Sequence, residues 1–266
     1  MSEPTPDPPP KRKIRISISR QRMVEFAVVV LGVLVALGLE NLIQEARYRA
    51  DARDLERAFI TDVSGAVFLS LERQAVTPCL IQRLRLLSVS VEAATGDLEP
   101  VEALPSGFIY ATPQIYRSPT RVWVTASFDR ALGSEAFKRI PAARADEYAG
   151  LFAQIKNQQE LNDAEFLAAM GLAPLAYSQP NMSAEVRADA LQQISNLDRH
   201  QAVIAAAREQ VVEAALDLTL IGRDVRQSLI EDDKAALQEY RSEMRAGYGD
   251  CVDFTAMERL LTPAAS

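Results

Sequence analysis

Residues 24–43 read VEFAVVVLGVLVALGLENLI, and this stretch decides the first element of the fold. Its central part, residues 26–39, carries no charge, and the acidic residues Glu25 and Glu40 stand near its two ends. About 20 helical residues at about 1.5 Å each cover roughly 30 Å, the thickness of the hydrocarbon core of a bilayer. The stretch therefore predicts one transmembrane helix over residues 23–43, with both carboxylates at the interfaces, where they reach water.

The charges on either side of this stretch predict its orientation. The chain has a net charge of -7, which divides into +4 on residues 1–22 and -11 on all that follows. Six basic residues precede the stretch, whereas residues 45–57 after it mix four arginines with four acidic residues. Because lysine and arginine favour the cytoplasmic side, we expect a cytoplasmic tail at residues 1–22 and a body outside the cytoplasm at residues 44–266. The residues that flank the predicted span are Lys11, Arg12, Lys13, Arg20, Arg22, Glu40 and Asn41.

A cleaved signal peptide is the alternative to an anchor. The uncharged part is only 14 residues long, and residues 36–38 (ALG) resemble a cleavage site. Apolar residues nevertheless continue at Leu39, Leu42 and Ile43, and neither glycine nor proline occurs from residue 44 until Gly65. An uncleaved anchor whose helix continues directly into the body is therefore the favoured prediction.

The rest of the chain predicts an all-α body, because its apolar residues recur at helical spacing. In residues 44–75, for example, Leu55, Phe59, Val63, Val67 and Leu71 recur every four residues. Proline, glycine and capping residues set the expected boundaries. We expect helices over residues 44–75 (ended by Pro78), 79–94, 118–133 (begun by Ser118-Pro119), 141–171 and 183–246, a short helical turn at Phe137, a final helix at 254–261, and loops at 97–117 and 172–182.

The helix expected over residues 183–246 carries a heptad pattern that favours helix packing. Its seam positions are Leu197, Ile204, Val211, Leu218 and Val225, and Ala207, Ala214 and Ile221 come three residues after Ile204, Val211 and Leu218. Because alanine makes a weak coiled-coil core, we expect the seam to pack within its own chain, and a coiled coil between two chains is the alternative. Apolar residues also spread beyond one face at Val203, Val212 and Leu220, which predicts contact with a partner protein or a second copy. Gly32 and Ala36 form a small-xxx-small pair through which two spans could also pack.

The chemistry available to the chain is sparse. With one histidine, His200, and two distant cysteines, no nitrogen or sulfur metal cluster is visible, and no glycine-rich phosphate loop, G-x-S-x-G or H-E-x-x-H motif occurs. An acidic body disfavours nucleic acid. We therefore expect no enzyme activity, cofactor or metal, and a role as a membrane-anchored interaction or sensor-like module whose partners are the bilayer and a protein. The alternative is an envelope enzyme with a dispersed active site.

Cys79 and Cys251 predict one disulfide. Both lie in the part of the chain expected outside the cytoplasm, where thiols oxidise, and each follows a turn-forming pair that could leave it at a helix end. Two free buried thiols and a bridge between chains are the alternatives. An intramolecular bridge would close a loop of about 170 residues and, in the chain-entropy model, contribute up to roughly 5 kcal/mol.

Two blocks of the sequence resemble a family of uncharacterised bacterial single-span membrane proteins. Residues 28–63 (VVVLGVLVALGLENLIQEARYRADARDLERAFITDV) are similar to the family's apolar segment, its exit and the charged helix that follows. Asn41 and Glu45 match that exit, and Leu42 stands where the family usually has a tryptophan. Residues 118–155 (SPTRVWVTASFDRALGSEAFKRIPAARADEYAGLFAQI) resemble a second block of helix, turn and tyrosine-bearing helix. The resemblance implies an inner-membrane, single-pass protein with an all-helical periplasmic domain, and it supplies no catalytic residue.

Overall fold

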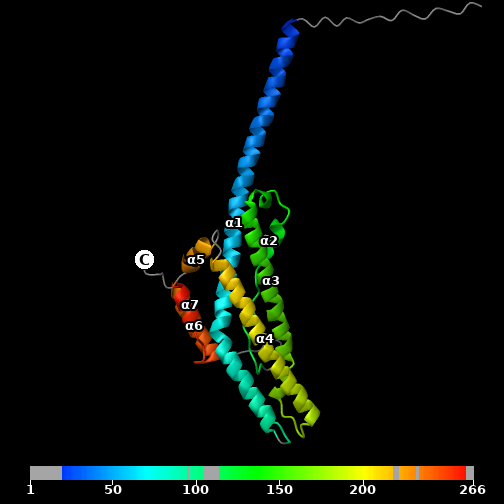
Figure 1. Ribbon diagram of the computed structural model, residues 1–266, viewed down its shortest axis with the longest axis vertical. Helices are drawn as coiled ribbons and strands as arrows, with labels where there is room; N and C mark the ends of the chain where they lie inside the picture. Colours follow the sequence, from blue (N-terminus) through cyan, green and yellow to red (C-terminus); the bar gives the residue numbers. More distant parts are fainter. Residues whose placement is uncertain (1–19, 95, 105–113, 218–221, 232–233, 262–266) are drawn as a thin grey trace, which may run out of the picture. The chain divides into compact units, whose positions relative to one another are not determined.

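The structure is a computed structural model that describes residues 20–94, 96–104, 114–217, 222–231 and 234–261 (Figure 1). It divides the chain into two compact units, residues 1–50 and residues 51–266, which are described separately. The described residues form seven α-helices and two short 3-10 helices, and they form no strand beyond a single bridge between Leu98 and Gln179. The predicted all-α fold is confirmed.

The first helix, α1, spans Arg20–Ala93 and is the longest element. It contains both the apolar stretch and the predicted helix of residues 44–75, so the expected helical continuation is confirmed. Within the second unit, its buried positions include Phe59, Val63, Val67 and Leu71, which are the residues that recur every four positions.

The prediction that Pro78 ends the first helix is wrong. α1 continues for another 15 residues after Pro78, to Ala93. Proline has no N–H with which to bond the carbonyl of Gln74, which is why a helix end was expected there. A tertiary contact lies beside this defect: the N–H of Asp253 donates to the carbonyl oxygen of Ala75 at 2.9 Å. The residues after Pro78 also bury the predicted apolar face, whose members are Leu80, Leu84, Leu87 and Val91.

The helix expected from Ser118 begins only at Ala126, because α2 spans Ala126–Ala131. The intervening residues include several β-branched side chains, which restrict helix formation. One of their backbone groups has a tertiary partner: the N–H of Trp123 donates to Oε1 of Gln159 at 2.8 Å. The predicted stop is correct, since Gly133 has a positive φ of 82°, which glycine adopts without strain. The 3-10 helix η1, Phe137–Arg139, is the predicted short turn.

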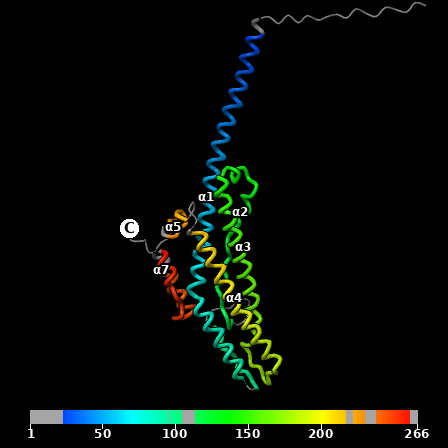
Figure 2. The backbone as a smooth tube through the Cα atoms, viewed as in Figure 1, coloured from blue at the N-terminus to red at the C-terminus, as the bar shows by residue number. Residues whose placement is uncertain are grey.

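Helices α3 (Ala142–Met170) and α4 (Ala184–Asp217) pack side by side, and they form the core of the second unit together with α1 (Figures 1 and 2). Pro141 precedes α3 and the hydroxyl of Ser183 accepts from the N–H of Val186 at 3.2 Å, so both predicted starts are confirmed. The connection between the two helices contains the 3-10 helix η2, Ala173–Ala176. Residues 97–104 and 114–117 are not helical, as predicted, and residues 105–113 of that expected loop lie outside the described residues.

An aromatic cluster closes one end of this core. Phe59 of α1 is surrounded by rings from three other elements, with ring centroids 5.0 Å away at Tyr148, 5.5 Å at Phe128 and at Phe152, and 6.3 Å at Phe137. Phe128 and Phe152 stack at 4.6 Å with nearly parallel planes. Such pairs contribute about 0.5–1.5 kcal/mol each beyond the area they bury. The cluster therefore fastens α2 and η1 to α1 and α3.

The prediction of a single helix over residues 183–246 is wrong, because three helices occupy this region. These are α4, α5 (Gly222–Glu231) and α6 (Lys234–Tyr248), and residues 218–221 and 232–233 between them lie outside the described residues. Gly222 allows the first break. After α4 the backbone returns so close to the end of that helix that a Cβ at position 222 would lie 2.4 Å from the carbonyl oxygen of Leu216, and only glycine lacks a Cβ. The last described helix is α7 (Thr255–Leu261), which follows Gly249, whose φ is 90°, so the predicted final helix is confirmed.

The heptad seam packs within the chain. Leu197, Ile204, Val211 and Val225 are buried, and α4 contacts α3 and α5. Leu218 and Ile221 lie outside the described residues. Intrachain packing of the seam was the expected outcome, and a coiled coil between two chains stays a prediction.

Candidate functional sites

The apolar stretch of α1 is exposed along its whole length. Within residues 23–43, all the large apolar side chains are exposed, from 38% at Val30 to 72% at Phe26. This is the one helix in the described part of the chain that is long and apolar enough to cross a membrane. Of the predicted flanking residues, Glu40 and Asn41 are exposed neighbours on α1, and Arg20 and Arg22 lie in its first turn. Lys11, Arg12 and Lys13 lie outside the described residues.

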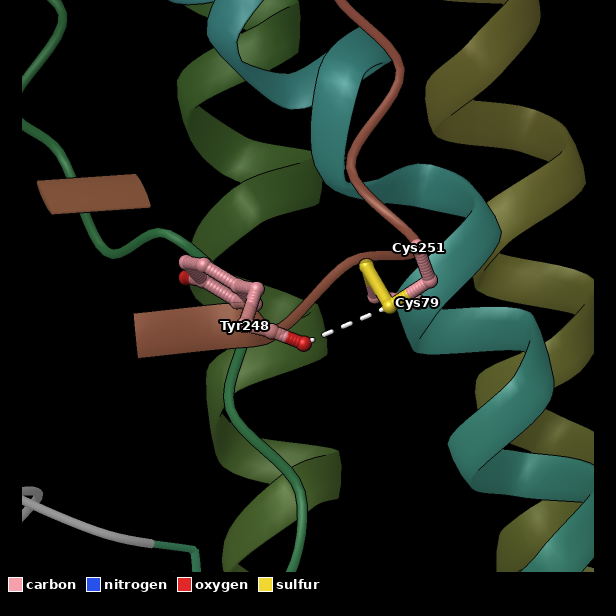
Figure 3. Close-up of a disulfide and its surroundings, with 3 residues drawn as sticks. All are labelled: Cys79, Tyr248 and Cys251. Carbon is pink, nitrogen blue, oxygen red and sulfur yellow. Dashed lines mark hydrogen bonds between the residues drawn. A yellow bond between two sulfur atoms is a disulfide. The ribbon is translucent and has the colours of Figure 1, made fainter. Parts of the chain in front are cut away.

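The two cysteines are joined in the second unit. A disulfide links Cys79 of α1 to Cys251, which lies between α6 and α7, with their Cα atoms 5.1 Å apart (Figure 3). Cys79 lies inside α1, well before its end at Ala93, so its expected position at a helix end is wrong, whereas Cys251 comes three residues after the end of α6 at Tyr248. Together with the hydrogen bond from Asp253 to Ala75, the disulfide fastens the C-terminal helices to α1 next to Pro78. The carbonyl oxygen of Tyr248 lies 3.3 Å from the sulfur of Cys251.

A cavity of about 220 Å³ opens beside this disulfide. Both cysteines line it, together with Arg83, Arg117 and Tyr248. Arg83 is held by backbone acceptors, because its Nε donates to the carbonyl of Ile115 at 2.6 Å and its Nη2 donates to the carbonyl of Glu102. Its burial lowers the pKa of Arg83 from the usual value, and the charge of Glu102 opposes this effect. The guanidinium of Arg117 lies 5.6 Å from the ring centre of Tyr248.

The helical core contains a buried cluster of polar side chains that was not predicted from the sequence. Its members are Arg73, Tyr116, Glu165 and Gln201, and it is called the polar cluster below. Oε1 of Glu165 accepts hydrogen bonds from Arg73, from Gln201 and, at 2.7 Å, from the hydroxyl of Tyr116. Nη2 of Arg73 also donates to Oε1 of Gln201 at 3.1 Å. The Arg73 and Glu165 side chains are only 4% and 0% exposed. The cluster joins α1, α3, α4 and the segment before α2.

Burial governs the electrostatics around the polar cluster. It raises the pKa of Tyr116 well above the usual value, and the neighbouring charge of Glu165 adds to the effect, so the phenol stays protonated. Burial lowers the pKa of Arg208, and the like charge of Arg73 lowers it further. Among the described residues, Arg73 Nε and Nη1 and Glu165 Oε2 have no hydrogen-bond partner. The cluster thus concentrates charge in the core, where each group is costly unless it is paired.

A second ion pair involves the neighbouring acidic residue of α1. Glu72 is buried and accepts from Nε of Arg121 at 3.1 and 3.2 Å and from Nη2 at 2.8 Å. This pair raises the pKa of Arg121. It ties the segment before α2 to α1 on the side that faces α6, where Tyr240 contacts Phe68 with ring centroids 5.1 Å apart. Two adjacent residues of α1 therefore bind different parts of the body: Glu72 binds the segment before α2, and Arg73 binds α3 and α4.

The described residues bring together no group of three or more histidine, cysteine, aspartate or glutamate side chains that could hold a metal ion. His200 is half-buried on α4. The absence of metal, cofactor and catalysis stays a prediction.

The chain was also compared with known proteins. It matches no protein-family model, no curated protein and no solved structure at a significant level. The geometry of the chain's own residues therefore carries the functional argument.

Proposed function

We propose that the chain is a single-pass membrane protein, anchored by residues 23–43, whose helical body lies outside the cytoplasm and acts through contact with a protein partner or a second copy. The observation that carries the proposal is the exposed apolar stretch of α1. The proposal agrees with an anchor in the bacterial inner membrane and a periplasmic body, which is also what the family resemblance implies.

The free energy of hydration supports a lipid environment for this stretch. Residues 23–43 expose 14 large apolar side chains. Full exposure of one such side chain in water costs about 1.5–3 kcal/mol, and at exposures of 38–72% the stretch costs roughly 12–25 kcal/mol. This cost is comparable to or larger than the net stability of a typical domain, about 5–15 kcal/mol. A bilayer removes it, since the stretch has the length of one hydrocarbon core.

Two independent features support the orientation. The basic tail precedes the stretch, which favours a cytoplasmic N-terminus. The Cys79–Cys251 disulfide belongs to the body, and disulfides persist in oxidising compartments outside the cytoplasm. Both features favour the same side of the membrane for the body, although one depends on electrostatics and the other on redox chemistry.

The experiment uses intact spheroplasts that carry the full chain with an epitope tag at each end. Protease added outside should digest the body and spare the N-terminal tag, and alkaline carbonate should leave the chain in the membrane. A body that is protected until the cells are lysed would contradict the orientation. Mass spectrometry of the isolated chain separates the anchor from a signal peptide, because cleavage would remove the residues before about Leu39.

The contact surface is tested on α4. Val203 is 51% exposed, whereas Val212 packs partly against the core and Leu220 lies outside the described residues, so Val203 alone is a clean test of the predicted surface. A photo-crosslinking amino acid at position 203 should trap one discrete adduct in membranes, and V203E should abolish the association. Val186 of the same helix is 48% exposed and provides the matched control. Equal crosslinking at positions 203 and 186 would contradict a specific contact.

A further inference from the structure

We propose that the Cys79–Cys251 disulfide is a thiol-exchange site for small thiols that carry a carboxylate, and that its opening releases the C-terminal helices α6 and α7 from α1. The observation behind the proposal is the cavity of about 220 Å³ that is lined by both cysteines and by two arginines. The inference concerns the body alone and does not depend on the orientation of the anchor.

The cavity lies against both residues of the disulfide, and these two residues differ in exposure. Cys251 is half-buried, whereas Cys79 is only 7% exposed. Both residues line the same cavity, so a thiolate that enters it approaches the disulfide directly. Since exchange requires access to a sulfur atom, Cys251 is the site of attack and Cys79 provides the leaving group.

The charges around the cavity favour an anionic thiol. Arg83 and Arg117 line it, and among the described residues no carboxylate does. The two hydrogen bonds of Arg83 go to neutral backbone carbonyls, which leave its charge in place. Glu102 acts on Arg83 through its charge without lining the cavity. A guanidinium pairs well with a carboxylate, and positive surroundings also stabilise thiolates.

The exchange proceeds in two balanced steps. The thiolate of the first molecule forms a bond to Sγ of Cys251 while the bond between Cys251 and Cys79 breaks, and the electron pair leaves on Sγ of Cys79, which takes a proton from water. A second molecule attacks the mixed disulfide, which frees Cys251 as a thiolate and forms the disulfide of the small thiol. The two small thiols supply the two electrons that reduce the protein.

Opening the disulfide removes the covalent link between α1 and the C-terminal helices. The remaining ties include the hydrogen bond from Asp253 to Ala75 and the ring contact between Phe68 and Tyr240. The disulfide spans 172 residues of sequence, so its loss also frees a long loop. We therefore expect the released state to loosen residues 234–261 while the packing of α3 against α4 persists.

The first experiment measures reduction rates of the purified full chain in neutral detergent. The thiols are 3-mercaptopropionate, 2-mercaptoethanol and cysteamine, and each rate is divided by the rate of the same thiol with 2-hydroxyethyl disulfide. The normalised rate should be highest for the carboxylate and lowest for the amine. R83Q and R117Q should each lower the ratio of anionic to neutral rates about fivefold, because one such charge contact contributes about 1 kcal/mol near water. Salt at about 1 M should lower the ratio as well.

Arg85 provides the matched control, because it is an exposed arginine on α1 that does not line the cavity. R85Q should leave the ratio of anionic to neutral rates unchanged. The ratio also separates charge recognition from altered packing, since a loosened cavity would accelerate all three thiols. Equal normalised rates for the three thiols, or a disulfide that reacts only once the body is unfolded, would overturn the proposal.

The second experiment follows amide hydrogen exchange of the chain before and after reduction and alkylation. Residues 234–261 should exchange at least tenfold faster in the reduced chain, while α3 and α4 keep their protection. Unchanged exchange in residues 234–261 would overturn the release, and so would uniform loosening of the whole body, which would make the disulfide a structural crosslink.

Discussion

Replacing Glu165 should strongly destabilise the body. Oε1 of Glu165 accepts from Arg73, Tyr116 and Gln201, and its side chain is fully buried. E165A removes the only carboxylate paired with Arg73 in the polar cluster and leaves the guanidinium buried without a counter-charge. Because the cluster joins α1 to α3 and α4, the loss should act on the whole body rather than on one helix.

The magnitude follows from burial. Removing one partner of a buried ion pair costs about 3–5 kcal/mol, whereas an exposed pair contributes about 0–1 kcal/mol. A unit of about 200 residues shifts its Tm by about 2–4 °C per kcal/mol, so E165A should lower Tm by about 6–20 °C. The double variant R73M/E165L removes both charges and should recover most of this loss, since an apolar pair often replaces a buried ion pair without net cost.

Thermal unfolding followed by circular dichroism, on the full chain in detergent with the disulfide intact, measures both variants. E160A is the matched control, because Glu160 is exposed on the same helix and should change Tm by less than about 2 °C. A change in Tm for E165A no larger than that of E160A would refute the reasoning. A double variant that is less stable than E165A would show that the cluster contributes net stability as a unit.

Three further predictions test other parts of the body. F59A should cost about 3–5 kcal/mol in the free energy of unfolding, because Phe59 is fully buried at the centre of the aromatic cluster, and denaturant titration measures this loss. G222A should destabilise the body, since its Cβ would lie 2.4 Å from the carbonyl oxygen of Leu216, whereas G150A on open helix surface should stabilise it by about 0.5–1 kcal/mol in the same titration. Burial raises the pKa of Tyr148 from 10 to about 12. Because the folded state holds the Tyr148 proton more tightly than the unfolded state, the stability that depends on the neutral phenol is complete below pH 10 and is lost as the pH rises through 12. Tm measured across that range should fall less in Y148F.

Much of the fold follows from local sequence signals. The spacing of Phe59, Val63, Val67 and Leu71 predicted the buried face of α1, and Pro141 and Ser183 predicted the starts of α3 and α4. These signals act over one or two helical turns, within which capping and side-chain periodicity determine structure. Residue patterns of this kind therefore predict helices and their faces well.

The errors arose where tertiary contacts decide local structure. Pro78 lies inside α1, next to the carbonyl of Ala75 that accepts from Asp253, and the N–H of Trp123 has a side-chain acceptor from α3. Gly222 lies against the end of α4. Each of these contacts involves a distant part of the chain or a backbone position, which residue spacing does not reveal.

The polar cluster left one signal in the sequence. The buried face of α3 contains Tyr148, Leu151, Phe152 and Ile155 and continues at helical spacing through Gln158, Asn162 and Glu165. Polar residues that extend an apolar stripe in register predict a polar layer in the core. Their partners on α1 and α4 could not be identified, because the pairing of Glu165 with Arg73 depends on how three helices are aligned.

This alignment gives the polar cluster its structural role. The apolar face of α1 repeats about every four residues, so a shift of α1 by one turn, about 5.4 Å, would place similar side chains against α3 and α4. The same shift would separate Arg73 from Glu165 and leave both charges unpaired in the core, at a cost of several kcal/mol. Glu72 would also lose Arg121, and Cys79 would move out of reach of Cys251. The apolar residues therefore provide the driving force for packing, whereas the ion pairs and the disulfide select one register of α1 within the body.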